Sequence, residues 1–267
     1  MRRRPIVSDQ FYPSNTAQLN DFINENKPKA SSRINAYGII LPHAGYIYSG
    51  KVAIETVYRV IPKKKIIILG PKHTAYGEDY SLWAKGSWAF SFGDIKIDEE
   101  LANLILKNSN LIKEDYLAHK FEHSIEVQLP ILYNIFGEFK FVPIACDVAQ
   151  LDTYIKVAEE ISSVTYRLKE ELLFVASTDM THYEPDATVR RKDRIAIDDI
   201  INFDVKSLLK HVEEENISMC GVAPVSILLL CLKTYGAQKA QVISYKTSAD
   251  VSGDYSSVVG YVGILLN

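Results

Sequence analysis

Residues 65–73, Lys-Ile-Ile-Ile-Leu-Gly-Pro-Lys-His, contain the pattern that decides the fold of this 267-residue chain. Their apolar run is short, rich in isoleucine, and stops at a Gly-Pro pair, as expected for a strand that is buried on both faces. Residues 37–41 and 172–176 form apolar runs of the same kind. Strands of this type belong to sheets that carry helices on both sides.

Segments with helical spacing alternate with these strands. We therefore predict an α/β protein, with one domain over residues 1–267 that has three layers, α/β/α, around a mixed sheet. The sheet is expected to be mixed because residues 80–97 alternate like an antiparallel hairpin. The predicted helices are residues 14–25, 51–60, 99–107, 124–135 (with a kink or break at Pro130), 151–168, 195–201, 205–214 and 222–235, and the remaining predicted strands are residues 139–145, 241–246 and 258–266.

The composition excludes several classes of protein. Hydrophobic residues make up 47% of the chain and charged residues 24%, which is typical of folded globular proteins. Lysine and arginine number 30 against 33 aspartates and glutamates, so the net charge of −3 gives no bulk attraction to nucleic acid. No apolar run approaches the ~20 residues that cross a bilayer. We therefore expect neither a nucleic-acid nor a membrane partner.

The three cysteines are Cys146, Cys220 and Cys231, and they form no C-x-x-C pair. An odd number without paired spacing is typical of a reducing compartment. The first residues are basic but lack the apolar stretch of a secretory signal. These features predict a cytoplasmic protein.

Three of the six histidines follow predicted strands. His43 comes after the strand at 37–41, His73 after 65–69, and His182 after 172–176. Ligands of open α/β sheets bind beyond the carboxyl ends of the strands. We therefore expect three imidazoles along one edge of the sheet, although each alone could be an unconnected loop residue.

Two neighbours could complete a site at this edge. Asp179 lies three residues before His182, so in a helical turn its carboxylate would share a face with the imidazole and orient it. Cys220 lies just before the predicted helix at 222–235, where a thiol has a lowered pKa and can act as a metal ligand or a nucleophile. A buried, inert cysteine is the equal alternative for Cys220.

The segment 122–130, Glu-His-Ser-Ile-Glu-Val-Gln-Leu-Pro, is dense in polar groups for a helix start. His123 and Glu126 are secondary candidates for the site. His119 is four residues before His123, but the glutamate that a zincin helix needs after the first histidine is missing, so we interpret His119 as a surface residue.

Five motifs taken together resemble the Memo family. They are residues 42–46 (PHAGY), 70–73 (GPKH), 122–126 (EHSIE), 177–182 (STDMTH) and 220–221 (CG), in the order and spacing of the family. The turn at residues 252–254 and the segment 258–261 are similar to the prokaryotic branch, the AmmeMemoRadiSam type. The resemblance covers nearly the whole chain.

The resemblance implies a fold similar to the LigB-type class III extradiol dioxygenases, which hold non-haem iron with two histidines and a carboxylate. Carried over to this chain, it implies His43 and His73 as metal ligands, Cys220 at the carboxylate position, and His182 as acid/base with Asp179 beside it. A thiolate is softer than a carboxylate, so copper or zinc are alternatives to iron, and the ion can be lost in purification. The resemblance also implies a link to a radical-SAM protein.

Three functions follow as hypotheses. The first is a non-haem metal-dependent oxidoreductase, dioxygenase-like, that acts on a small substrate. The second is a metal-free binding or scaffold protein that uses the same cleft for a peptide or partner. The third is a hydrolase or transferase with Cys220 as nucleophile, His182 as base and Asp179 as orienter.

Overall fold

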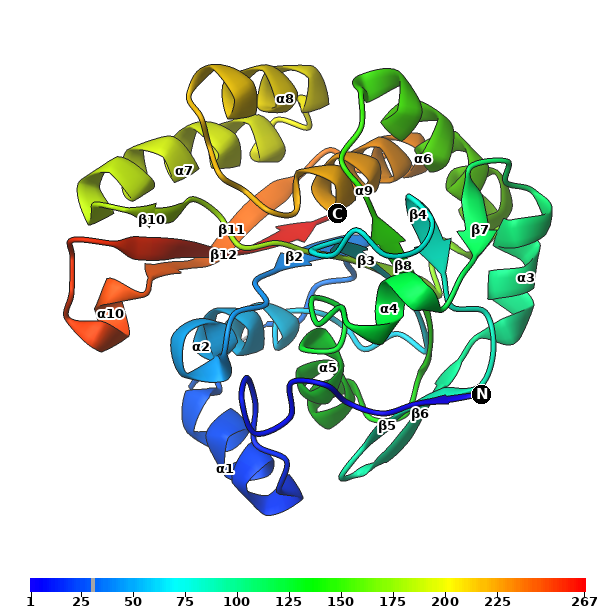
Figure 1. The fold of residues 1–267 in the computed structure, drawn as a ribbon, viewed down its shortest axis with the longest axis horizontal. Coiled ribbons are helices and arrows are strands. Elements are labelled where there is room, and N and C mark those ends of the chain that lie inside the picture. Colours follow the sequence, from blue (N-terminus) through cyan, green and yellow to red (C-terminus); the bar gives the residue numbers. More distant parts are fainter. Residues whose placement is uncertain (30–31) are drawn as a thin grey trace.

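The computed structural model describes residues 1–29 and 32–267 and contains one mixed sheet between two helical layers (Figure 1). Four parallel strands form its centre, in the order β8 (Lys140–Cys146), β3 (Lys65–Pro71), β9 (Leu172–Ser177) and β2 (Gly38–Leu41). Almost every residue of these strands is buried. The predicted three-layer α/β/α fold and the four central strands are confirmed.

Antiparallel pairs extend the sheet on both sides, as predicted for a mixed sheet. β12 (Val258–Leu266) runs antiparallel to β2 and to β11 (Ala240–Thr247). On the other side, β5 (Ser87–Phe90) and β6 (Gly93–Ile97) form the hairpin expected within residues 80–97. The shorter strands are β1 (Arg2–Arg3), β4 (Tyr80–Leu82), β7 (Ile112–Glu114) and β10 (His182–Glu184).

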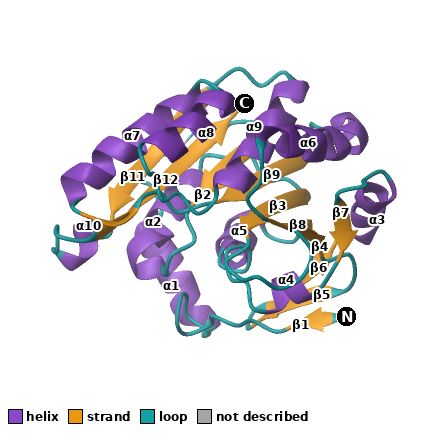
Figure 2. Ribbon diagram, turned by 45° about the horizontal axis from the view of Figure 1, so that its top comes forward, coloured by secondary structure: helices purple, strands orange, loops and turns teal. Residues whose placement is uncertain are grey.

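Helices cover both faces of the sheet (Figure 2). No helix in the described part of the chain has the length and apolar character needed to cross a membrane. One layer holds five helices, namely α3 (Glu99–Lys107), α6 (Leu151–Thr165), α7 (Asp186–Ile201), α8 (Val205–Glu214) and α9 (Val222–Tyr235). The other layer holds α1 (Thr16–Asn26), α2 (Tyr46–Val57) and α5 (Gln128–Phe136). The short helices are α4 (Leu117–Lys120), η1 (Tyr166–Leu168) and α10 (Ala249–Ser252).

Four helices start at residues that differ from the prediction, and for α1 the start is Thr16 and not residue 14. α2 and α7 begin earlier than expected, while α5 begins at Gln128 and not at residue 124. Pro130 consequently falls in the first turn of α5, where its missing N–H would be unpaired anyway, so the helix is not broken there. The residues before α5 are left outside the helix, in a loop that reaches the end of β3.

The buried carboxylate of Glu126 anchors the N-terminal segment. It pairs with the Arg3 guanidinium at 2.6 Å, with both side chains almost fully buried. It also accepts hydrogen bonds from the backbone N–H groups of Ile6 and Val7 and from the Tyr12 hydroxyl at 2.8 Å. The N-terminal segment is therefore an integral part of the fold.

We expect Glu126→Gln to destabilise the protein by about 3–5 kcal/mol, because it leaves the Arg3 charge buried without a counter-charge. The matched control is Arg2→Gln, which removes a charge from the exposed Arg2–Asp94 pair and should leave the stability almost unchanged. Urea unfolding of both variants measures the difference. Equal effects would contradict the anchoring role of Glu126.

Candidate metal centre

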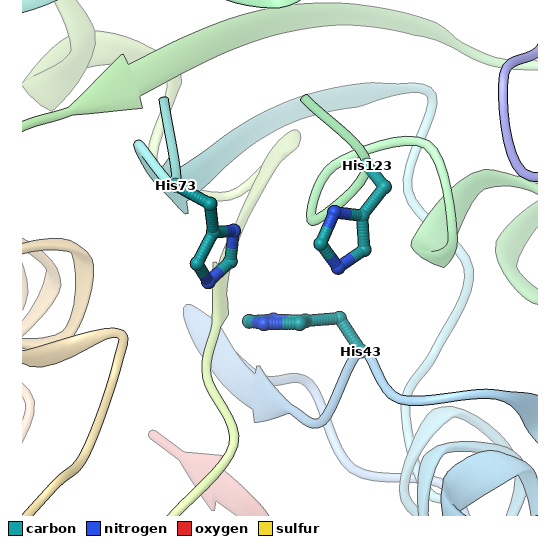
Figure 3. Close-up of side chains that lie close together, drawn as sticks. All are labelled: His43, His73 and His123. Carbon is teal, nitrogen blue, oxygen red and sulfur yellow. The ribbon is translucent and has the colours of Figure 1, made fainter. Parts of the chain in front are cut away.

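Two of the predicted histidines meet at the carboxyl edge of the sheet. His43 follows β2 and His73 follows β3, and their ring centroids lie 5.2 Å apart. A third imidazole, that of His123, stacks on His73 at 5.0 Å and lies 5.6 Å from His43 (Figure 3). Each ring offers one nitrogen such that all three atoms lie within 4.8 Å of one another. This group is the strongest candidate for a metal-binding site among the described residues.

The loop that carries His123 reaches the other two histidines because Gly70 has no side chain. A Cβ atom on Gly70 would lie 2.6 Å from both Ser124 Oγ and Ile125 Cγ1, which is closer than atoms can approach. Ser124 Oγ also donates a hydrogen bond to the carbonyl of Pro71 at 3.1 Å. The close approach of these two segments places His123 beside His73.

Glu122 ties the two segments together. Its carboxylate accepts hydrogen bonds from the backbone N–H groups of His73 (2.7 Å), His123 (2.9 Å) and Ser124 (2.8 Å) and from His73 Nδ1 (3.0 Å). Burial alone would raise the pKa of Glu122, but the bonds and charge of His73 and the backbone donors hold it well below the usual range. Glu122 is therefore ionised, and His73 Nδ1 carries the donated proton.

A serine fixes the tautomer of His43. Ser177 Oγ donates its one proton to the carbonyl of Ser124 and accepts a hydrogen bond from the Gln128 amide, each at 2.8 Å. It can therefore only accept from His43 Nδ1, which lies 2.8 Å away. The proton of His43 is on Nδ1, so Nε2 has a lone pair, which faces Cys220 Sγ at 3.4 Å and could bind a metal ion in place of the thiol proton.

The same reasoning leaves Nε2 of His73 free, because Glu122 holds the proton on Nδ1. A carboxylate or hydroxyl behind the ring is the usual support of a metal-ligating histidine, since it fixes the ring and raises its basicity. Neither ring nitrogen of His123 makes a hydrogen bond within the described residues, and its ring is held by His73 and by Phe11, at 4.9 Å. All three imidazoles therefore have a nitrogen lone pair to offer.

Burial and mutual repulsion keep two of the rings neutral. Burial lowers the pKa of His43 and of His123, and the neighbouring imidazoles lower both further. Burial also acts to lower the pKa of His73, but the hydrogen bond and charge of Glu122 outweigh it and raise the pKa overall. The side chain of His43 is 3% exposed, whereas His73 and His123 are 33% and 23% exposed. The centre therefore opens to solvent on the side of His73 and His123.

Cys220 lies at the inner side of this group. Its Sγ is 3.4 Å from Nε2 of His43 and accepts a hydrogen bond from the backbone N–H of Asp179 at 3.2 Å. Gly221 permits this approach, because a Cβ there would lie 2.3 Å from Thr178 Cβ. Burial and the Asp179 carboxylate raise the pKa of Cys220, so the lowered pKa expected at a helix start is wrong.

The distances fit a metal ion. In a tetrahedral site, a nitrogen ligand about 2.0 Å from the ion and a sulfur ligand about 2.3 Å from it lie about 3.5 Å from each other. The Cys220 Sγ–His43 Nε2 distance of 3.4 Å already matches this separation. The three imidazole nitrogens lie within 4.8 Å of one another, and the Cys220 sulfur is not part of that group, so side chains would have to move toward one ion for all four to bind it. The donor set of imidazoles and one thiol suits iron, copper or zinc.

The side chains of Asp179 and His182 do not interact as predicted but bind different partners. Residues 178–181 are not helical, and no hydrogen bond joins the two side chains in the described part of the chain. Asp179 Oδ1 instead accepts from the backbone N–H of His43 at 2.8 Å. His182 Nδ1 donates to the carbonyl of Ser218 at 2.8 Å, so its Nε2 is free. Asp179 supports His43, and Ser218 orients His182.

Two residues of the 119–126 segment face away from the centre. The Glu126 carboxylate points to the N-terminal segment, as described above. His119 is fully buried and not a surface residue as predicted from the sequence, because its ring packs edge-on against both Trp83 and Trp88. Its Nε2 donates to the carbonyl of Ser81, and burial lowers its pKa to about 4.

Sequence reasoning gave His123 only a secondary place and assigned no role to Glu122, Ser177 or Ser218. The signal that could have found Glu122 and Ser177 is their position inside the motifs that carry His123 and Asp179. Glu122 contacts His73 about 50 positions away in the sequence, and Ser177 contacts His43 about 130 positions away. No local sequence pattern encodes contacts over such separations.

Comparison with known proteins identifies relatives over the whole chain. The family model described as Memo-like protein matches residues 3–265. A MEMO1 family protein of Methanopyrus kandleri is 39% identical over 99% of both chains, and one of Methanocaldococcus jannaschii is 37% identical over 99% of this chain and 98% of its own. An uncharacterized Escherichia coli K12 protein shares the fold, with a TM-score of 0.56 and 11% identity over 84% of this chain and 98% of that one.

We expect His73 to titrate above the ordinary histidine value of 6.5 in metal-free protein, and His43 and His123 below it. Glu122→Gln removes the opposing charge and leaves burial as the main effect, so the pKa of His73 should fall below 6.5. Histidine-selective NMR titration measures both. A higher pKa for His123 than for His73 would contradict this account of the Glu122 carboxylate.

Proposed function

The chain belongs to the Memo-like family, and from its histidine cluster we propose that it binds one metal ion at the carboxyl edge of the sheet. The observation that carries the proposal is the meeting of His43, His73 and His123 within 4.8 Å. Imidazole suits iron, copper and zinc, and iron is the ion that we propose, with copper and zinc as the alternatives.

Four side chains would hold the ion. His43 and His73 offer Nε2 lone pairs whose tautomers are fixed by Ser177 and Glu122. Cys220 is already at the ligand separation from His43, and His123 supplies the fourth donor on the exposed side. Because the thiol pKa is raised in the metal-free protein, Cys220 would lose its proton when it ligates the ion.

The ion would supply redox chemistry, so we propose a non-haem metal-dependent oxidoreductase that acts on a small substrate. The substrate would approach from the open side of His73 and His123. His182 keeps its proton on Nδ1 through the Ser218 carbonyl, so Nε2 can take a proton from a substrate as general base. Asp179 would act as a positioning residue, since its carboxylate holds the backbone of His43. The link to a radical-SAM protein stays a prediction of the family resemblance.

The surroundings of Cys220 argue against the metal-free hydrolase or transferase. A nucleophilic cysteine needs thiolate character near neutral pH. Burial and the Asp179 carboxylate act in the opposite direction and keep the sulfur protonated. Its nearest imidazole is His43, whose lowered pKa makes it a poor partner for a thiolate–imidazolium pair.

We expect protein purified without chelators to contain close to one metal ion per chain, and His43→Ala and His73→Ala to contain almost none, because each removes a ligand with a fixed tautomer. His211→Ala is the matched control, since His211 is an imidazole paired with Asp199 outside the cluster. Elemental analysis by mass spectrometry measures the content. Equal metal in the wild type and the two ligand variants would contradict the proposal and favour the metal-free binding protein.

Cobalt substitution separates the contributions of Cys220 and His123. We expect a thiolate-to-cobalt charge-transfer band in the wild type that is retained in His123→Ala and lost in Cys220→Ala, because only sulfur gives this transition. Near-ultraviolet absorption measures it. A cobalt-loaded wild type without the band would remove Cys220 from the ligand set and leave the three imidazoles.

A further inference from the structure

A cavity lies between the N-terminal segment and α4, and none of the three clustered histidines lines it. It has a volume of about 610 Å³, which is within the range of small-molecule sites. Trp83 lines it, and Tyr116 packs against Trp83 with ring centroids 4.8 Å apart. Leu117 of α4 and Phe121, the residue directly after that helix, form one wall, and residues 1–6 form the other. We call this cavity the α4 groove.

The α4 groove exposes large apolar side chains to water. Leu117 is 47% exposed, Phe121 51% and Ile6 37%. Apolar side chains exposed around one cavity favour ligand binding, because covering them would release free energy that the isolated chain does not gain. The lining therefore favours a ligand with an apolar body.

Every charged residue that lines the groove is a cation, namely Arg2, Arg3, Arg4 and Lys120. Arg2 and Arg3 are occupied by Asp94 and Glu126. Arg4 and Lys120 are exposed and form no ion pair with the described residues, and Lys120 Nζ lies 5.2 Å above the ring of Phe121. This concentration of positive charge in a chain of net charge −3 selects an anionic group at the mouth of the groove.

The two walls are held at a fixed separation. The Arg3 guanidinium lies over the Trp88 ring at 4.1 Å and donates to the carbonyls of His119 (2.9 Å) and Glu122 (2.7 Å), one on each side of the C-terminal end of α4. The N-terminal segment and α4 are thus joined through a buried, fully paired side chain. The groove is a formed cavity, and binding does not require the walls to be ordered first.

We propose that the α4 groove binds an amphipathic carboxylate, with its apolar body against Trp83, Leu117 and Phe121 and its carboxylate at Arg4 and Lys120. The proposal rests on the groove alone and is independent of the metal centre. Charge complementarity sets the sign of the head group, and the apolar walls set the character of the tail.

Decanoate and decyltrimethylammonium test this proposal, because their alkyl tails differ by only one carbon and their head groups have opposite charge. The chain has two tryptophans, Trp83 in the groove and Trp88 with its ring centroid 6.0 Å from that of Trp83, so tryptophan fluorescence reports on this region. Titrations in the presence of a chelator, below the micelle concentration, exclude binding through a metal. We expect a saturable change with decanoate and none with decyltrimethylammonium.

The double variant Arg4→Glu/Lys120→Glu should weaken decanoate binding by about tenfold or more, because it removes charged hydrogen-bond donors to the carboxylate. The matched control is Lys107→Glu/Lys239→Glu, which makes the same change of charge at exposed positions outside the groove and should bind as the wild type does. Phe121→Ala should also weaken decanoate binding, because it removes an aromatic ring against which the apolar tail would pack. Equal binding of both probes, binding of neither, or wild-type affinity in Arg4→Glu/Lys120→Glu would each overturn the proposal.

Discussion

The buried carboxylate of Glu122 is the interaction on which the centre depends. It gathers the backbone of His73, His123 and Ser124 and one imidazole around a single negative charge. Burying a carboxylate is costly unless its oxygens are fully hydrogen-bonded, and here the donors come from two segments that are distant in sequence. The charge stabilises the close packing of three imidazoles, and it would partly balance a cation between them. The loop at residues 122–127 is consequently kept out of α5 and held at the end of β3.

The central strands and two of the histidines could be predicted because both follow from local pattern. Apolar runs that stop at proline and glycine define parallel strands, and parallel neighbours place the residues that follow them at one edge. His43 and His73 meet for this reason. His123 follows no strand, and its position depends on the absence of a side chain at Gly70. The Asp179–His182 spacing indicated a shared helical face, but the backbone there is not helical, and the two side chains bind different partners.

The segment from α4 to Glu126 joins three parts of the molecule. Its first residues line the α4 groove, Glu122 and His123 belong to the proposed metal centre, and Glu126 anchors the N-terminal segment through Arg3. Arg3 in turn binds the carbonyl of Glu122, so the groove and the centre share one rigid support. The density of polar residues in this stretch, which looked unusual for a helix start, reflects these three sets of contacts.

The most direct test of the account is a crystal structure of the protein grown with cobalt(II), with data collected on both sides of the cobalt absorption edge. The account predicts one strong anomalous peak at about 2.0–2.3 Å from Nε2 of His43, Nε2 of His73 and Sγ of Cys220, with His123 beside it. Cobalt bound at full occupancy elsewhere, with no metal at Nε2 of His43 or of His73, would contradict it.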